Sequence, residues 1–106
     1  MKKKLILAYV LAASSIIAVL FFWQQNALLT LLLLAICAAT LVTIGKKDFP
    51  VFFLTSLFGA LSEILAIRFG VWTYANPTYL GIPLWLPLLW GQASLFICAA
   101  YIDQVK

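Results

Sequence analysis

The sequence predicts an all-α integral membrane protein with four transmembrane helices and both chain ends in the cytoplasm. Of the 106 residues, 66% are hydrophobic and 9% are charged, and the mean hydropathy is +1.13. Soluble domains are instead roughly half apolar and about a quarter charged. A membrane-spanning helix needs about 20 mostly apolar residues, and the chain contains four such runs. We therefore predict one polytopic transmembrane domain over residues 1–106.

The four apolar runs are expected to form helices over about 5–23, 27–44, 51–69 and 82–101. The first run follows three lysines and is longer than the apolar core of a signal peptide, so we expect a membrane span and no cleavage. The second run ends at Gly45, and Pro50 precedes the third, which are signals of a helix stop. An aromatic and polar loop is expected over 70–81, before the fourth helix.

The basic residues predict the orientation in the membrane. Alternating four spans place six lysines on one side and only Arg68 on the other, and cytoplasmic segments carry the excess of basic residues. The lysines are Lys2, Lys3, Lys4, Lys46, Lys47 and Lys106. We therefore predict a multi-pass protein of the bacterial inner membrane, with the 70–81 loop outside.

The composition also excludes several kinds of site. The chain has no histidine and only three acids, Asp48, Glu63 and Asp103, so neither a metal site nor a cofactor is expected. Cys37 and Cys98 lie inside apolar runs, where a thiol usually acts as a small hydrophobic group, and free cysteines are expected. Because the net charge of +4 sits at predicted helix ends, the expected partner is the lipid bilayer, with no role for nucleic acid. The sequence fits both homo-oligomers and hetero-oligomers.

Glu63 is the candidate functional residue within the spans. Counted from Val51 it lies about 18 Å along the helix, in the outer half of the membrane. An ionisable group at that depth is costly and is a functional candidate by default. Small residues share its helix face and favour an orientation toward a neighbouring helix; they are Ser56, Gly59, Ala60, Ala66 and Gly70. Arg68 projects about 140° away around the helix, so an ion pair with Glu63 is not expected.

Aromatic residues and prolines gather between the outer loop and the fourth predicted helix. The simplest interpretation of the aromatic rings is a belt at the outer interface, formed by Trp72, Tyr74, Tyr79 and Trp85. Pro83 suits a first helical position and Pro87 removes one hydrogen bond, so an irregular first turn is expected. Two faces of this helix are candidates to meet Glu63: one carries Trp85, Gln92 and Phe96, and the other carries Gly91, Ser94 and Cys98.

These features form an ordered string over about a quarter of the chain. Glu63 is followed by Gly70-Val71-Trp72-Thr73-Tyr74, then by Leu80-Gly81-Ile82-Pro83, and finally by Pro87 and Trp90. The string resembles carotenoid hydratases and lycopene cyclase-like membrane proteins, although the chain has no Pro-x-Glu-Glu segment of the cyclase type. The resemblance implies acid-catalysed hydration or cyclisation of an isoprenoid- or carotenoid-like polyene, by this chain alone or as one subunit of a larger enzyme.

The resemblance also implies roles for individual residues. Glu63 is the candidate general acid, because protonating a double bond needs an acid that holds its proton in a dry site. Aromatic faces would stabilise the resulting carbocation. The ligand-binding candidates are Trp72, Tyr74, Trp85, Trp90 and Gln92, and the structural candidates are Gly70, Gly81, Pro83 and Pro87.

Three other interpretations fit the same residues. In the first, Glu63 accepts hydrogen bonds from a loop amide, an indole N–H or Ser94 and pins the fourth helix and the outer loop onto the third. In the second, the chain is a small proton-coupled multidrug-type exporter, although such proteins carry their glutamate in the first helix and no inverted repeat is visible here. In the third, small-residue faces dock partner helices and the protein is a non-catalytic membrane scaffold.

Overall fold

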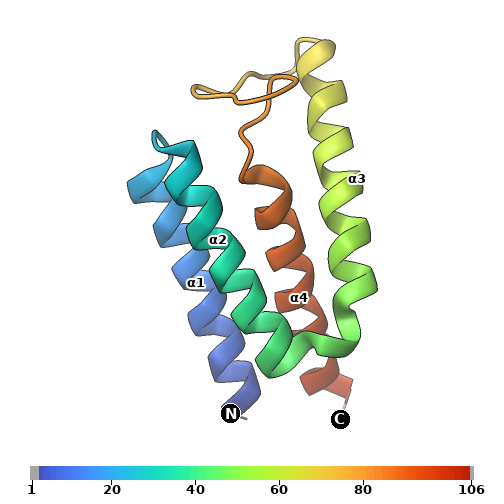
Figure 1. Cartoon of the computed structure of the whole chain (residues 1–106). Helices are drawn as coiled ribbons and strands as arrows, with labels where there is room; N and C mark the ends of the chain where they lie inside the picture. The colour runs from blue at the N-terminus through green and yellow to red at the C-terminus, as the bar shows by residue number, and fades with distance from the viewer. Residues whose placement is uncertain (1–2, 106) are drawn as a thin grey trace.

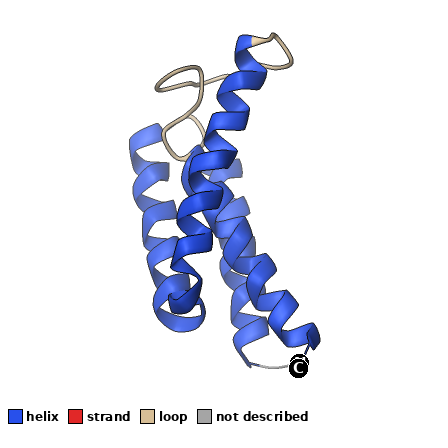
Figure 2. Ribbon diagram, turned by 90° about the vertical axis from the view of Figure 1, so that its right-hand side faces the viewer, coloured by secondary structure: helices blue, strands red, loops and turns tan. Residues whose placement is uncertain are grey.

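A computed structural model describes the backbone of residues 3–105 and the side chains of residues 3–101. It contains four α-helices: α1 (Lys3–Phe22), α2 (Asn26–Thr40), α3 (Phe49–Arg68) and α4 (Leu86–Val105). Figure 1 shows their arrangement, and Figure 2 shows that the described residues are helix and loop. The predicted all-α class is confirmed.

The connection between α2 and α3 differs from the predicted helix stop. A π-helical turn over Leu41–Gly45 and a 3-10 turn over Lys46–Asp48 link the two α-helices, so the helical backbone continues from Asn26 to Arg68. Pro50 lies in the first turn of α3, where its missing N–H costs no hydrogen bond. The described residues therefore form three unbroken helical stretches, of which the second is bent (Figure 1).

The fourth helix begins later than predicted. It starts at Leu86 instead of residue 82, and the preceding loop covers 69–85 instead of 70–81. Pro83 is buried in this loop and is not the first helical residue, which corrects the sequence interpretation. Pro87 occupies the first helical turn, where the lack of an N–H is tolerated.

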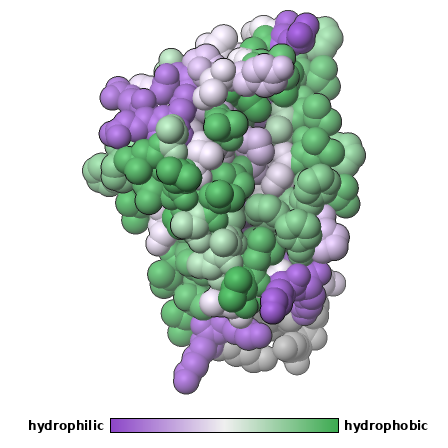
Figure 3. Space-filling model, in the orientation of Figure 1, coloured by the Kyte–Doolittle hydropathy of each residue, from purple (hydrophilic) through white to green (hydrophobic). Residues whose placement is uncertain are grey.

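The surface is strongly apolar between two polar ends (Figure 3). Large hydrophobic side chains are exposed on every helix; Phe21 in α1 is 75% exposed, and Phe69, directly after α3, is 83% exposed. The stretches Lys3–Phe22 and Asn26–Arg68 are long and apolar enough to cross a membrane, whereas the apolar part of α4, Leu86–Tyr101, is shorter. Exposed apolar surface of this extent is a liability in water but suits contact with lipid. These features indicate membrane association.

Helix α4 contacts each of the other three helices, with α3 on one side and α2 on the other (Figure 1). Glycines bring α3 and α4 together: a Cβ atom at Gly59 would lie 2.3 Å from the Trp90 ring, and one at Gly91 would lie 2.4 Å from the Phe52 ring. Close approach through small residues is how membrane helices pack, since apolar burial alone gives them little attraction. The small-residue face of α4 is therefore the one that meets α3.

Two turns shape the loop that precedes α4. Gly70, at φ +76°, ends α3 in a Schellman-type turn, in which Val71 N–H donates to the Ala66 carbonyl (2.9 Å) and Gly70 N–H donates to the Ile67 carbonyl (3.0 Å). Further on, Tyr79 and Ile82 exchange two backbone hydrogen bonds of 3.0 Å around Leu80 and Gly81, which both have positive φ. This is the pattern of a type I′ hairpin turn. It folds the loop back over the helix ends.

Candidate functional site

Glu63 lies on the buried face of α3, with Gly59 and Ala60 as its buried neighbours. Only 9% of its surface is exposed. The orientation expected from the small-residue face is therefore correct: the side chain points into the bundle toward α4 and the loop. Arg68, in contrast, is exposed at the end of the same helix.

Three aromatic side chains donate hydrogen bonds to the Glu63 carboxylate. The Trp72 indole N–H donates to Oε1 at 3.0 Å. The Tyr74 hydroxyl and the Trp90 indole N–H both donate to Oε2, at 2.9 and 3.2 Å. We call these four residues the Glu63 centre. The sequence suggested a loop amide, an indole N–H or Ser94 as partners of Glu63. The structure shows two indole N–H donors, those of Trp72 and Trp90.

The Glu63 centre joins three parts of the fold. Gly70 reverses the chain at the end of α3, so that Trp72 and Tyr74 return toward the helix that they have just left. Trp90 reaches the same carboxylate from the second turn of α4, across the close contact at Gly59. A single side chain thus holds the loop and α4 against α3.

The donors suit an ionised carboxylate. An indole nitrogen can only donate, whereas a tyrosine hydroxyl can donate or accept. Burial, the hydrogen bond to Glu63 and the charge of Glu63 together raise the pKa of Tyr74 to about 12. The hydroxyl therefore keeps its proton near neutral pH and remains available as a donor. Hydrogen bonds to a charged acceptor are about twice as strong as those between neutral groups.

Two of the candidate ligand-binding residues do not contact Glu63, which corrects their expected placement at that site. Trp85 is buried, at 6% exposure, and its indole N–H donates to Asn26 Oδ1 at the start of α2 (3.1 Å). Gln92 is also buried, and its Nε2 donates to Thr40 Oγ1 near the end of α2 (3.0 Å). Trp85, at the end of the loop, and Gln92, in α4, both project toward α2, while Trp90 projects toward α3. Trp85 is consequently not part of an exposed aromatic belt.

Asn26 is a structural residue that the sequence interpretation missed. Its Nδ2 donates to the Asn76 carbonyl (2.9 Å) and to Thr78 Oγ1 (2.7 Å), while its Oδ1 accepts from Trp85. Asn76 in turn donates to the carbonyls of Trp23 and Gln24 in the turn between α1 and α2. The loop is therefore tied to α1 and α2 as well as to α3. The sequence signal is slight: an asparagine at a polar break between two apolar runs.

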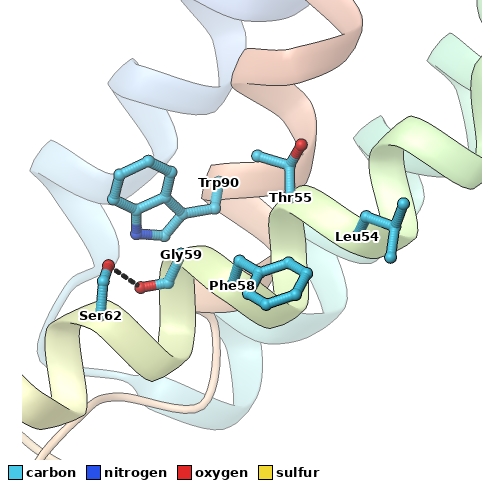
Figure 4. A pocket seen from close by; sticks show the side chains of 6 residues that line it. All are labelled: Leu54, Thr55, Phe58, Gly59, Ser62 and Trp90. Atoms are coloured by element: carbon cyan, nitrogen blue, oxygen red, sulfur yellow. Dashed lines mark hydrogen bonds between the residues drawn. The ribbon is translucent and has the colours of Figure 1, made fainter.

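A groove runs along α3 beside the Glu63 centre (Figure 4). It has a volume of about 330 Å³, and its lining comes from α3 except for Trp90, which α4 supplies. Trp90 is 37% exposed. Its ring forms part of the groove wall, while its indole N–H donates a hydrogen bond to Glu63. The groove-lining residues are Leu54, Thr55, Phe58, Gly59, Ser62 and Trp90.

The described residues contain no group of three or more histidine, cysteine, aspartate or glutamate side chains that could hold a metal ion. Cys37 and Cys98 are free, and Cys37 Sγ donates to the Leu88 carbonyl at 3.5 Å. No known protein family, curated protein or solved structure matches this chain. The chemistry available at the site is therefore that of one carboxylate, three aromatic donors and an adjacent apolar groove.

Proposed function

We propose that this protein is a small multi-pass membrane protein that binds an apolar isoprenoid- or carotenoid-like molecule in the groove beside the Glu63 centre. The observation that carries the proposal is the double role of Trp90. Its indole N–H bonds the Glu63 carboxylate, and its ring forms one wall of an apolar groove. A polyene lying in the groove would touch the Trp90 ring, and Trp90 in turn contacts Glu63, the only carboxylate within α3.

Acid catalysis at Glu63 is the proposed chemistry, and the resemblance to carotenoid hydratases and lycopene cyclases motivates it. Glu63 would first take up a proton from water, then transfer it to a double bond of the ligand and return to the carboxylate form. The resulting carbocation would either add water and release a proton, which gives a hydrated product, or close a ring and lose a proton to the Glu63 carboxylate. The indole N–H groups of Trp72 and Trp90 would then stabilise that carboxylate, and aromatic ring faces would stabilise the developing carbocation. Tyr74 can accept a hydrogen bond from the protonated carboxyl by rotating its hydroxyl.

Binding of lycopene to the purified protein in nanodiscs tests the groove. We expect saturable quenching of tryptophan fluorescence, and about fivefold weaker binding for Phe58→Ala, which removes about 1 kcal/mol of aromatic contact. Phe53→Ala is the matched control, because Phe53 is an equally apolar, exposed residue of α3 outside the groove. Equal binding by both variants, or no saturable binding, would contradict the groove assignment.

Product analysis tests the chemistry separately. With lycopene bound, the wild-type protein should form a hydrated or cyclised product, and Glu63→Gln should bind lycopene but form none. A Glu63→Gln variant that retains full activity would rule out the general-acid role. Binding without any product in the wild type would leave ligand binding as the function and remove the catalytic part of the proposal.

The proposal includes four membrane crossings, by α1 to α4, with both chain ends in the cytoplasm. In support, the start of α1 (with Lys3 and Lys4) and the turns that join α2 to α3 (with Lys46 and Lys47) lie at the same end of the bundle as the end of α4 (Figure 1). The end of α3, with Arg68, lies at the opposite end of the bundle. Lys2 and Lys106, which entered the prediction, are outside the described residues.

Single-cysteine labelling tests this topology, in a variant with Cys37 and Cys98 replaced by alanine. An impermeant maleimide should label Val71→Cys in intact cells but label Lys47→Cys only after the membrane is opened, since both positions are exposed on the protein. The reverse pattern would invert the orientation. Labelling of both positions from outside would mean that α3 does not cross the membrane.

A cation exporter is the second candidate. The three aromatic side chains that surround the Glu63 carboxylate favour it. A carboxylate flanked by indole and phenol rings can bind an organic cation by charge and by cation–π contact. Tetraphenylphosphonium distinguishes the two candidates. If the Glu63 centre binds cations, tetraphenylphosphonium should displace lycopene, and its binding should be lost in Glu63→Gln.

A further inference from the structure

The chain enters α4 through an irregular stretch, residues 78–85, which we call the entry segment. Helix α4 begins deeper in the bundle than α3 ends, and the entry segment descends to it from the end of the bundle (Figure 1). The apolar part of α4, Leu86–Tyr101, is about 24 Å long at about 1.5 Å per residue. The hydrocarbon core of a bilayer is about 30 Å thick, so a fourth crossing by α4 alone falls short by about 6 Å.

The backbone of the entry segment forms hydrogen bonds within the protein, although it is not helical. Ile82 N–H donates to the Tyr79 carbonyl (3.0 Å). The Ile82 carbonyl accepts from the N–H groups of Thr78 (2.9 Å) and Tyr79 (3.0 Å). Leu84 N–H donates to Thr78 Oγ1 (3.1 Å), and Pro83 has no N–H to satisfy. Irregular backbone at membrane depth requires such internal partners, because hydrocarbon offers none.

Protein covers one side of the entry segment. Ile82 and Trp85 are 7% and 6% exposed, and Pro83 is fully buried. Gly81 lies directly against the Ile67 side chain of α3. Non-helical backbone occurs at membrane depth where protein buries it in this way. The entry segment therefore meets the structural conditions for lying in the membrane as the outer end of the fourth crossing.

The other side of the entry segment presents apolar side chains to the surroundings. Leu80 has φ +53°, at a turn position where asparagine, aspartate or glycine is usual. A leucine is strained in this left-handed conformation. Its side chain is 49% exposed, and those of Leu84 and Tyr79 are 53% and 70% exposed. Exposed leucines in a strained turn suit an environment of hydrocarbon better than one of water.

We propose that the entry segment is embedded in the outer leaflet of the bilayer, where Leu80 and Leu84 contact lipid hydrocarbon and Tyr79 lies at the headgroup boundary. This surface continues the exposed apolar surface of the helices. The proposal rests on the four crossings proposed above and moves the second half of the loop from the outside into the membrane. Val71 directly follows α3, close to Arg68, and stays on the aqueous side.

Spin-label accessibility in nanodiscs tests the depth, in the variant with Cys37 and Cys98 replaced by alanine. Leu84→Cys carries the label in the entry segment. Gln24→Cys, in the exposed turn between α1 and α2, is the aqueous control, and Leu57→Cys, on an exposed part of α3, is the hydrocarbon control. Collisions with a water-soluble nickel chelate should be at least about tenfold rarer at Leu84 than at Gln24, because hydrocarbon excludes polar solutes. Nickel accessibility at Leu84 equal to that at Gln24 would overturn the proposal.

Leu80→Asn provides a test in which water and lipid give changes of opposite sign. Asparagine suits the left-handed turn better than leucine, so in water the substitution should raise the unfolding temperature. In lipid a polar amide must enter hydrocarbon, so we expect the unfolding temperature in nanodiscs to fall by about 4 °C or more. Val71→Asn is the matched control on the aqueous side and should change it little. A rise or no change in Leu80→Asn would contradict an embedded entry segment.

Failure of this proposal can be distinguished from failure of the proposed function. Maleimide labelling at Val71 and Lys47 tests the crossing by α3, and lycopene binding tests the groove, but neither measures the depth of Leu84. If the crossing is confirmed and the Leu84 label lies in water, only the embedded entry segment is wrong, and thinning of the bilayer would account for the short helix. If α3 does not cross the membrane, the proposal fails together with the topology.

Discussion

Replacing Glu63 by leucine is expected to lower the free energy of unfolding by about 2–3 kcal/mol and to release the loop over 69–85. The substitution removes the common acceptor of Trp72, Tyr74 and Trp90. Hydrogen bonds to a charged group contribute about 1.5–3 kcal/mol each. The net loss is smaller than their sum because leucine also removes the cost of burying a charge. Thermal unfolding in detergent, followed by circular dichroism, measures the stability change.

Two further measurements test whether the stability lost in Glu63→Leu comes from release of the loop and α4. Limited proteolysis should show faster cleavage within 69–85 in Glu63→Leu, because Trp72 and Tyr74 then no longer hold the loop to α3. Glu63→Gln should give an intermediate loss, since one amide oxygen can still accept from Tyr74 and Trp90 while the amide nitrogen faces a donor. Unchanged stability in Glu63→Leu would show that the centre does not hold the loop and α4 in place.

Gly59→Ala is expected to destabilise the packing of α3 on α4 by about 2 kcal/mol, within the range found for overpacked sites. The new Cβ would lie 2.3 Å from the Trp90 ring, so the ring must move and its N–H must leave Glu63 Oε2. The expectation is notable because alanine favours a helix over glycine by about 1 kcal/mol. A steric effect must therefore exceed a gain in helix propensity. Thermal unfolding again provides the measurement.

Gly45→Ala is the matched control for this prediction. At Gly45 the nearest atom to a new Cβ is Leu95 Cδ2, at 3.1 Å, which is the end of a flexible side chain. We expect a loss of no more than about 1 kcal/mol, because the end of the Leu95 side chain has to move by only a few tenths of an ångström. If the two variants lost equal stability, the close contact between Gly59 and Trp90 would not be a special requirement for packing α3 on α4.

The anchoring and binding interpretations of Glu63 are compatible in this structure. The three donors place the carboxylate where it can brace the loop and α4, and the same contact connects it to the ring that lines the groove. A ligand that shifts Trp90 would lengthen its bond to Glu63 and so affect the loop. If the groove binds a ligand as proposed, that binding would be linked to the order of the loop through the Trp90 indole.

Several parts of this protein could be predicted from the sequence because they depend on local chemistry. The apolar runs define the helices to within a few residues, since the length of an apolar run and its polar flanks are local properties. The face of α3 that carries Glu63 follows from helical periodicity, because Gly59 and Ala60 lie about one turn away. Gly70 and Gly81 stand where the backbone needs positive φ, as their spacing between helices suggests.

The partners of the polar side chains were decided only by the tertiary structure. Trp72, Tyr74 and Trp90 meet at Glu63 because the Schellman turn reverses the loop and Gly59 lets α4 approach α3. Trp85 and Gln92 turn toward α2, although the sequence placed them with the same site. Helical periodicity specifies which residues share a face, but which neighbour that face meets depends on how four helices pack around one another. That choice is made by shape and hydrogen bonding between segments far apart in the chain.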